Sequence, residues 1–178
     1  MSKCLFLISW FLASLLAHAQ DFKVEFDKNS DFSHYKTFTF GDCQIITPHD
    51  LRTIPDSVIH HWVKKAVTIN LTAKGLTRVQ GPADLVVSYL TGSDKHSDAG
   101  SVGPLGLTPG VNTSQTYFRD YQEVTLVVDL NDSKTNSLLW RINARTTTSP
   151  SEGERFIDQN VERGFRKFNL RPKKIKKK

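Results

Sequence analysis

Two segments in the last third of the chain alternate so regularly between apolar and other side chains that they restrict the fold more than any other feature. An apolar residue occupies every second position over 124–130 and again over 138–144. Strict alternation is typical of a strand with one face in a core, and the short polar stretch between the two segments predicts an antiparallel hairpin. With the apolar faces in register, the predicted pairs are Leu130 with Trp140, Val128 with Ile142, and Leu126 with Ala144.

The outer face of this hairpin provides candidate contact residues. The same register places Asp129 opposite Arg141, and Arg145 belongs to the second strand of the hairpin. We interpret Asp129 and Arg141 as a cross-strand ion pair on the surface, which contributes well under ~1 kcal/mol. The alternative is that Asp129, Arg141 and Arg145 form an exposed recognition site.

Three further segments are predicted strands. Residues 22–26 and 35–40 alternate between apolar and polar positions, whereas 84–90 is apolar on both faces, which indicates a central strand. Residues 41–50 are predicted to be a loop. Residues 92–115 are rich in Gly, Ser, Pro and Asp and have no periodicity. We expect them to form a long mobile loop, and loops of this length are often functional.

The clearest helix is predicted over 53–74, with Thr53 as its cap and Gly75 as its end. At about 100° per residue, one arc of this helix is apolar. Its members are Val58, Ile59, Trp62, Val63, Ala66, Ile69 and Ala73. We expect this arc, and Trp62 with it, to lie on a sheet, with His61 on the polar arc in water.

A second amphipathic helix is predicted near the C-terminus, because Ser151 and Glu154 match a capping box. Its apolar positions are Ile157, Val161, Phe165 and Phe168. The predicted order of elements is therefore β-β-α-β-β-β-α. This order indicates an α+β fold in which two amphipathic helices pack on one face of a mostly antiparallel sheet. We expect a single domain over 20–170.

The N-terminal segment has the pattern of a signal peptide. A lysine precedes an almost wholly apolar run over 5–16, and the AHA motif at 17–19 places small residues at the two positions that a signal peptidase reads. The run is shorter than the ~20 residues that cross a bilayer as a helix. We therefore expect cleavage that removes residues 1–19 and a periplasmic or outer-membrane-associated mature protein. A lipid anchor is not expected, because Cys4 precedes the apolar run and Gln20 stands where the lipid-bearing cysteine would be.

The formal net charge of +6 is concentrated at one end of the chain. Residues 163–178 hold nine Lys/Arg and no acid, whereas residues 20–162 hold 14 Lys/Arg and 18 Asp/Glu. Nucleic-acid-binding domains usually spread their basic residues over a folded face, so we expect no nucleic-acid partner. The basic tail over 171–178 either is solvated or binds anionic lipid head groups or lipopolysaccharide phosphates at low salt. Its charged residues are Arg171, Lys173, Lys174, Lys176, Lys177 and Lys178.

No known catalytic or metal-binding motif stands out in the sequence. No two histidines have the i, i+4 spacing of helical zinc sites. Asp56 and His60 do have this spacing, but the helix dipole explains an acid in the first helical turn. Cys43 could act as a nucleophile with His34 or His49 as its base, although nothing around it matches a known nucleophile motif. We therefore expect no metal and no cofactor.

Four stretches resemble a known bacterial family. They are DFSHYKTFTF at 31–40, AKGLTRV at 73–79, ADLVVSYL at 83–90 and VTLVVDLNDSKTNSLLWR at 124–141. Together they resemble domain of unknown function 4136, over residues 22–168, and the last stretch is the most specific. The chain departs from the common pattern at Phe40, where members often have Trp, and at Val124 and Ile142, where they often have Gly. It also lacks the lipid-bearing cysteine of many members. The resemblance implies an α+β domain of the bacterial cell envelope and no particular reaction.

These observations favour an exported bacterial envelope protein that acts as a non-enzymatic binding or structural module. Its expected partner is another envelope protein or an anionic envelope surface. The alternative is a small-ligand-binding protein or a hydrolase, with a site between the 92–115 segment and the end of the hairpin.

Overall fold

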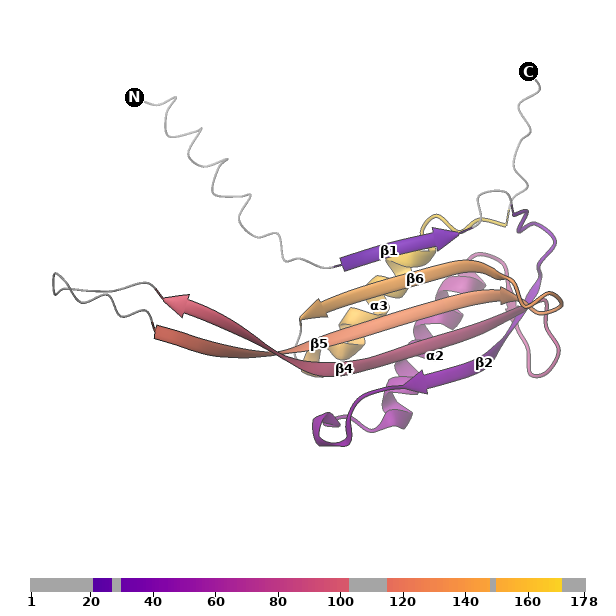
Figure 1. The fold of residues 1–178 in the computed structure, drawn as a ribbon. Helices are drawn as coiled ribbons and strands as arrows, with labels where there is room; N and C mark the ends of the chain where they lie inside the picture. The colour runs from indigo at the N-terminus through magenta and orange to yellow at the C-terminus, as the bar shows by residue number, and fades with distance from the viewer. Residues whose placement is uncertain (1–20, 27–29, 103–114, 148–149, 171–178) are drawn as a thin grey trace, which may run out of the picture.

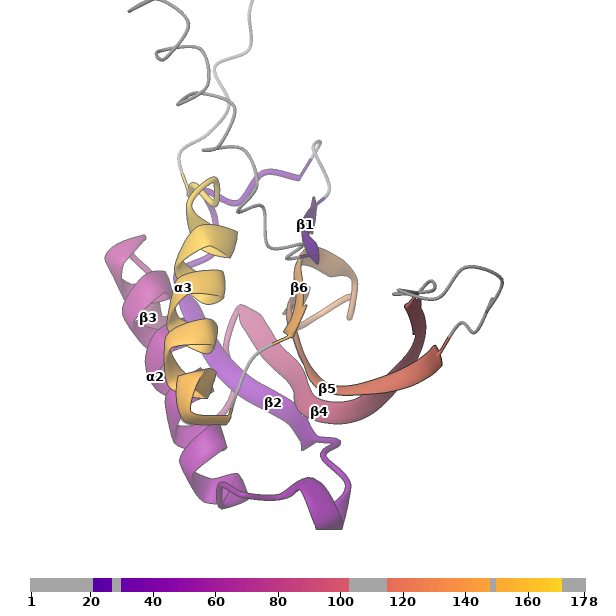
Figure 2. The same cartoon turned by 90° about the vertical axis from the view of Figure 1, so that its left-hand side faces the viewer.

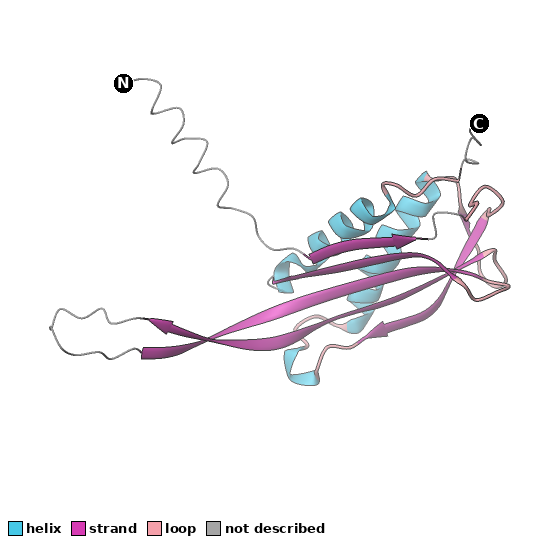
Figure 3. Cartoon of the chain, turned by 45° about the horizontal axis from the view of Figure 1, so that its top comes forward, coloured by secondary structure: helices cyan, strands magenta, loops and turns pink. Residues whose placement is uncertain are grey.

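The computed structural model describes residues 21–26, 30–102, 115–147 and 150–170 (Figure 1). In chain order the elements are β1 (Asp21–Phe26), β2 (Thr37–Ile45), η2 (His49–Leu51), α2 (Asp56–Ala73), β3 (Thr77–Arg78), β4 (Leu85–Val102), β5 (Gln115–Asp132), β6 (Leu138–Thr147), η3 (Pro150–Glu152) and α3 (Gly153–Phe165). Figure 3 shows a long twisted sheet with α2 and α3 beside it. The predicted α+β class is confirmed, with two α-helices and a six-stranded sheet in the described ranges.

The sheet is mixed, and the prediction of a mostly antiparallel sheet is therefore wrong. Its strand order is β1-β6-β5-β4-β2-β3. The pairs β1–β6, β6–β5 and β5–β4 are antiparallel, but β2 pairs in parallel with both β4 and β3. Helix α2 explains the difference, because a crossover helix returns the chain to the end of the sheet from which it came. The two-residue strand β3 adds a member to the predicted order, and so short a strand has no alternation to reveal it.

The predicted register of the β5–β6 hairpin is confirmed. Leu130 pairs with Trp140, Val128 with Ile142, and Leu126 with Ala144. All six side chains are buried. They form the centre of the core, between the sheet and the two helices that cover one of its faces (Figure 2).

The segment predicted to be a mobile loop over 92–115 is largely strand. β4 continues without a break to Val102, and β5 begins at Gln115, with which Val102 pairs. Only residues 103–114 of the segment lie outside the described part of the chain. The two strands satisfy each other's main-chain hydrogen bonds without covering a core, so the side-chain alternation that reveals a strand is absent here.

β2 is also longer than the pattern predicts. It continues to Ile45 with a register shift between Phe40 and Cys43, whereas the sequence predicts a loop over 41–50. Phe38 is fully buried, and Phe40 and Cys43 pack against the core beyond it. The shift breaks the alternation of apolar residues and so hides the second half of the strand.

The buried face of helix α2 overlaps the predicted arc at Val63 and Ala66 but is shifted from it. Its buried residues are Val63, Ala66, Val67 and Leu71. Trp62 is only partly buried, and Ile69 is 59% exposed. The helix begins at Asp56 with Pro55 as its N-cap and no side-chain cap, so the predicted capping role of Thr53 is also wrong. Gly75, with φ at +101°, follows the helix end as predicted.

Helix α3 confirms the second amphipathic segment but not its cap. Ile157, Val161, Phe165 and Phe168 are all buried. The helix begins at Gly153 with Glu152 at the N-cap position, and no side-chain hydrogen bond caps it. Glu154 forms an ion pair with Lys65 of α2 instead of a capping box, at 3.0 Å between Nζ and Oε1.

Candidate functional site

Beyond the core the sheet narrows to two strands. The last β2–β4 pair is Ile45 with Thr91, and the last β5–β6 pair is Glu123 with Thr147. From there outward, β4 and β5 pair only with each other among the described residues. We call this extension, residues 93–102 and 115–122, the ribbon. It projects away from the helices and from the rest of the sheet (Figure 1).

The described part of the ribbon carries aromatic side chains, of which Phe118 is exposed and His96 and Tyr121 are half-buried. Phe118 is 73% exposed. The rings of His96 and Tyr121 stack across the two strands, with centroids 5.6 Å apart. Exposed aromatic surface on strands with unpaired edges is typical of a surface that contacts another molecule.

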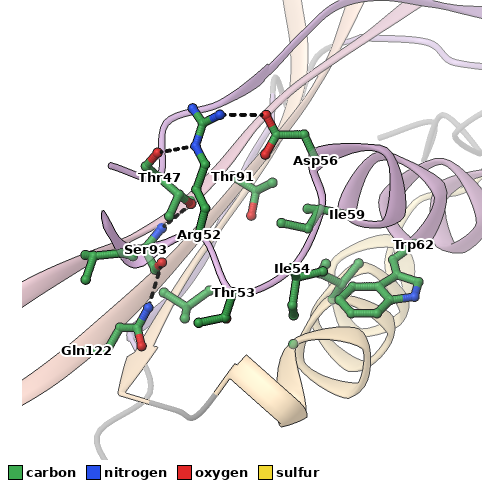
Figure 4. A pocket seen from close by; sticks show the side chains of 15 residues that line it. Thr47, Arg52, Thr53, Ile54, Asp56, Ile59, Trp62, Thr91, Ser93 and Gln122 are labelled. Carbon is green, nitrogen blue, oxygen red and sulfur yellow. Dashed lines mark hydrogen bonds and ion pairs between the residues drawn. The ribbon is translucent and has the colours of Figure 1, made fainter. Parts of the chain in front are cut away.

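Close contacts fasten the base of the ribbon to the body of the protein. The Ser93 backbone N–H donates to Thr47 Oγ1 at 3.1 Å, and Gln122 Nε2 donates to Ser93 Oγ at 2.9 Å (Figure 4). The neighbouring Gly92 has no room for a side chain, because a Cβ there would lie 2.7 Å from Ile46 Cγ1. The ribbon therefore leaves the sheet from a firmly held base.

A small cavity of about 60 Å³ lies at this base. Its walls come from the segment between β2 and α2, from the first half of α2, from β4 and β5, and from the start of α3 (Figure 4). The apolar wall includes Ile54, Ile59 and Trp62. At the rim, Arg52 donates through Nε to the Thr47 carbonyl at 2.9 Å and through Nη1 to Asp56 Oδ2 at 3.2 Å.

This cavity has room for a few water molecules, whereas sites for small organic ligands usually measure ~300 Å³ or more. Its polar groups Arg52, Asp56, Ser93 and Gln122 are engaged in the hydrogen bonds already described. We therefore interpret this cavity as a packing gap where the ribbon meets the body of the protein.

Cys43 lies in surroundings that the sequence does not predict. The side chains that influence the pKa of the Cys43 thiol are Tyr89, Lys64 and Asp42, and neither His34 nor His49 is among them. The neighbour of Cys43 across the ladder is Tyr89, whose hydroxyl lies 2.6 Å from His60 Nδ1. This neighbour could be found only after the parallel β2–β4 register was known.

The thiol of Cys43 is protonated at neutral pH. Burial raises its pKa, and this outweighs the opposing hydrogen bond from the Tyr89 hydroxyl and the positive charge of Lys64. Because the thiolate is the reactive form of cysteine, the site is a poor nucleophile. In the described ranges, no three His, Cys, Asp or Glu side chains are placed so that they could hold a metal ion.

The three candidate contact residues of the hairpin lie on the outer face of the sheet and are engaged in ion pairs. Arg141 binds Asp129 through two hydrogen bonds, of 2.8 Å from Nε and 2.6 Å from Nη2. The Asp129 carboxylate raises the pKa of Arg141 further. Arg145 Nε lies 3.2 Å from Glu123 Oε1. Asp129 and Arg141 thus bind each other on the body of the sheet. Arg145 lies at the base of the ribbon, because the Glu123 oxygen that it contacts is also 3.8 Å from Nε2 of the ribbon residue His96.

The predicted tail contacts, residues 171–178, lie outside the described part of the chain. Neither α2 nor α3 combines the length and the apolar character that a membrane-crossing helix needs.

Comparison with known sequences agrees with the resemblance noted above. The model of the family described as domain of unknown function (DUF4136) matches residues 22–168. No curated protein sequence matches the chain.

Solved structures with a similar fold come from several bacteria. A PDZ domain protein from Parabacteroides distasonis is 15% identical, with a TM-score of 0.53; the match covers 88% of this chain but only 38% of that one. A DUF4136 family protein from Bacteroides thetaiotaomicron is 15% identical, with a TM-score of 0.49 and coverage of 82% and 94%. A PelC dodecamer from Paraburkholderia phytofirmans is 12% identical, with a TM-score of 0.48 and the same coverage. At these identities the likeness extends to the fold alone.

Proposed function

This chain belongs to the DUF4136 family, and on that premise we propose that it is an exported cell-envelope module that binds a protein partner through the ribbon. The proposal rests on one observation. Among the described residues, the outer parts of β4 and β5 pair only with each other, so a two-stranded extension with two open edges projects from the six-stranded sheet.

The physical cost of the ribbon supports a binding role. An isolated two-stranded ribbon is at best marginally stable in water, and open strand edges promote unwanted pairing with other chains. A partner that adds a strand to either edge satisfies the free main-chain groups, which is a recurring mode of peptide recognition. The exposed ring of Phe118 offers such a partner an apolar anchor.

A non-enzymatic role is supported by the chemistry of the described residues. The cavity at the base of the ribbon is small, and the polar groups described there are engaged with each other. The Cys43 thiol is held in its unreactive form. Export is supported by the apolar run over 5–16 and the AHA motif at 17–19.

Site-specific photo-crosslinking in the native host tests the proposal. A photoreactive phenylalanine analogue replaces Phe118 on the ribbon, and in a matched protein it replaces Ile69, which is 59% exposed on the outer side of α2. We expect a discrete crosslinked protein from position 118 and none from position 69. In addition, Phe118→Ser should abolish co-purification of that protein, whereas Ile69→Ser should not. Equal crosslinking from both positions, or loss of the partner in both serine variants, would contradict the proposal.

A further inference from the structure

A second surface lies in a groove between the edge strand β1 and the end of α3. The groove has a volume of about 340 Å³. Its lining residues are Phe22 and Val24 of β1, with Arg163, Gly164, Arg166 and Lys167 of the last turn of α3 and the residues after it. It is thus a groove with an apolar strand on one side and three cations on the other.

Among the described residues, the cations of this groove are distinguished by their number, because three of them line one groove without a carboxylate partner, whereas other unpaired cations such as Lys36 and Lys134 stand elsewhere. Elsewhere, the ion pairs of Lys/Arg residues with carboxylates include Arg52–Asp56, Lys65–Glu154 and Arg141–Asp129. Arg163, Arg166 and Lys167 have no carboxylate partner within the described ranges. No acidic side chain lines the groove.

Arg163 is held in place by an aromatic ring. Its guanidinium carbon lies 4.1 Å from the centroid of the Phe22 ring. Stacking of this kind uses the face of the guanidinium plane and leaves its N–H donors available at the edge. These donors suit the oxygen atoms of a phosphate group. A fourth cation is nearby, because Lys74 Nζ donates to the Arg166 carbonyl at 3.2 Å.

The alternative explanation is purely structural: these cations stabilise the C-terminal end of α3. The helix dipole favours positive charge there, and Arg163 lies in the last turn. Arg166 and Lys167 follow the helix end, however, and the sequence after Leu170 adds six more Lys/Arg within residues 171–178. Positive charge therefore accumulates well beyond what one helix end requires.

We propose that this groove binds the phosphate head groups of an anionic phospholipid membrane. Peripheral membrane binding combines clustered Lys/Arg with partly exposed apolar surface. The three groove cations provide the basic cluster, and Phe22 and Val24 provide the apolar surface. An acidic protein segment would match the charge but would make less use of the apolar strand. This inference is independent of the ribbon and its partner.

Vesicle co-sedimentation of the full mature chain tests the inference. The probe is vesicles of phosphatidylcholine with phosphatidylglycerol, compared with phosphatidylcholine alone at low salt. The groove variant is Arg163→Gln/Arg166→Gln/Lys167→Gln. The control is Lys36→Gln/Arg78→Gln/Lys134→Gln, which removes the same charge from exposed residues outside the groove and the ribbon. Unchanged melting temperatures confirm that both variants are folded.

We expect the groove variant to bind the anionic vesicles roughly tenfold more weakly than the parent, and the control to bind within about twofold of it. Inorganic phosphate should compete no better than chloride of equal ionic strength, because a membrane presents many head groups at once. Equal loss of vesicle binding in the two variants would show that net charge alone determines binding, and it would overturn the proposal. Undiminished binding by the groove variant would also overturn it, as would retention on an acidic polypeptide without any binding to vesicles.

Discussion

Gly164 has the most restricted position of the glycines near the core. A Cβ at this position would lie 2.3 Å from Ile142 Cδ1 and 2.5 Å from its Cγ1. Ile142 is fully buried on β6, so it has no free space into which to move. The absence of a side chain at Gly164 therefore sets how closely α3 approaches the sheet.

We expect Gly164→Ala to destabilise the protein by ~1–3 kcal/mol, because overpacking outweighs the gain in helix propensity. Gly153→Ala is the matched control within the same helix. A Cβ there would meet only Trp62 Cζ3, at 3.4 Å, so this variant should be neutral or slightly stabilising. Urea unfolding measures both changes, and a stabilised Gly164→Ala would show that α3 can shift on the sheet at little cost.

Asp132, at the turn between β5 and β6, has the most strongly lowered carboxyl pKa in the described part of the chain. Its carboxylate accepts hydrogen bonds of 2.8 Å from the backbone N–H groups of Lys134 and Thr135 and from the Tyr35 hydroxyl. The Thr135 bond is the largest cause, and together these bonds lower the pKa of Asp132 to about 2. The residue thereby ties the turn to the segment before β2.

A group with a lowered pKa stabilises the fold above its unfolded pKa, near ~3.9 for Asp, and loses that contribution as the pH falls toward the folded value. We therefore expect the free energy of unfolding to fall between about pH 4 and pH 2, with Asp132 responsible for part of the slope. Urea midpoints measured across this range should fall less steeply for Asp132→Asn. Tyr35→Phe should give an intermediate slope, since it removes one of the three donors. Parallel curves for all three proteins would exclude the assigned role.

At the level of elements, the sequence predicts each strand that borders the core but not where the sheet extends beyond it. The register of β5 and β6 follows from their alternation, because each has one buried and one exposed face. The outer half of β4, from Ser93 to Val102, has no buried face, and so its pairing leaves no trace in the hydrophobic pattern. For the same reason the sequence indicates that the 92–115 segment is functional but predicts a loop there and not a two-stranded ribbon.

The spacing of apolar residues also does not identify the buried face of α2. The helix shares its apolar residues between the sheet and α3, and Trp62 lies beside Gly153 at the start of α3. One sequence arc cannot show which of two neighbours each residue meets. The buried face is instead displaced toward Val67 and Leu71.

The revised face leads to a direct comparison of two residues on α2. Leu71→Ala should destabilise the protein by ~2–5 kcal/mol, because Leu71 is fully buried. Ile69→Ala should change stability by no more than ~0.5 kcal/mol, because Ile69 is largely exposed. Chemical denaturation of the two variants measures the difference. Similar losses of stability in the two variants would instead support the orientation of α2 that the apolar arc of the sequence predicts.

At the level of the whole molecule, the first question is where the mature chain begins. We expect Gln20 to be the mature N-terminus, because the AHA motif at 17–19 supplies small residues at both positions that a signal peptidase reads. β1 begins at Asp21, so cleavage there removes no residue of the sheet. Intact mass of the protein from the periplasmic fraction should correspond to a chain without residues 1–19 and without lipid. An uncleaved or acylated chain would refute this expectation.

The second question is whether the body of the protein needs the ribbon in order to fold. The large buried hydrophobic side chains belong to the helices, to the inner halves of β4 and β5, and to their neighbours, and none lies within the described ribbon residues. Replacing residues 96–121 by an Asn-Gly turn between the cross-strand partners Lys95 and Gln122 should therefore leave the free energy of unfolding within ~1 kcal/mol of the parent. The hydrogen bond from Gln122 to Ser93 remains at the base. The shortened protein should nevertheless lose the partner captured from position 118. If it unfolds, the ribbon is part of the folding unit; if it still binds the partner, the contact surface lies elsewhere, and either result would contradict the separation of binding from stability inferred from the fold.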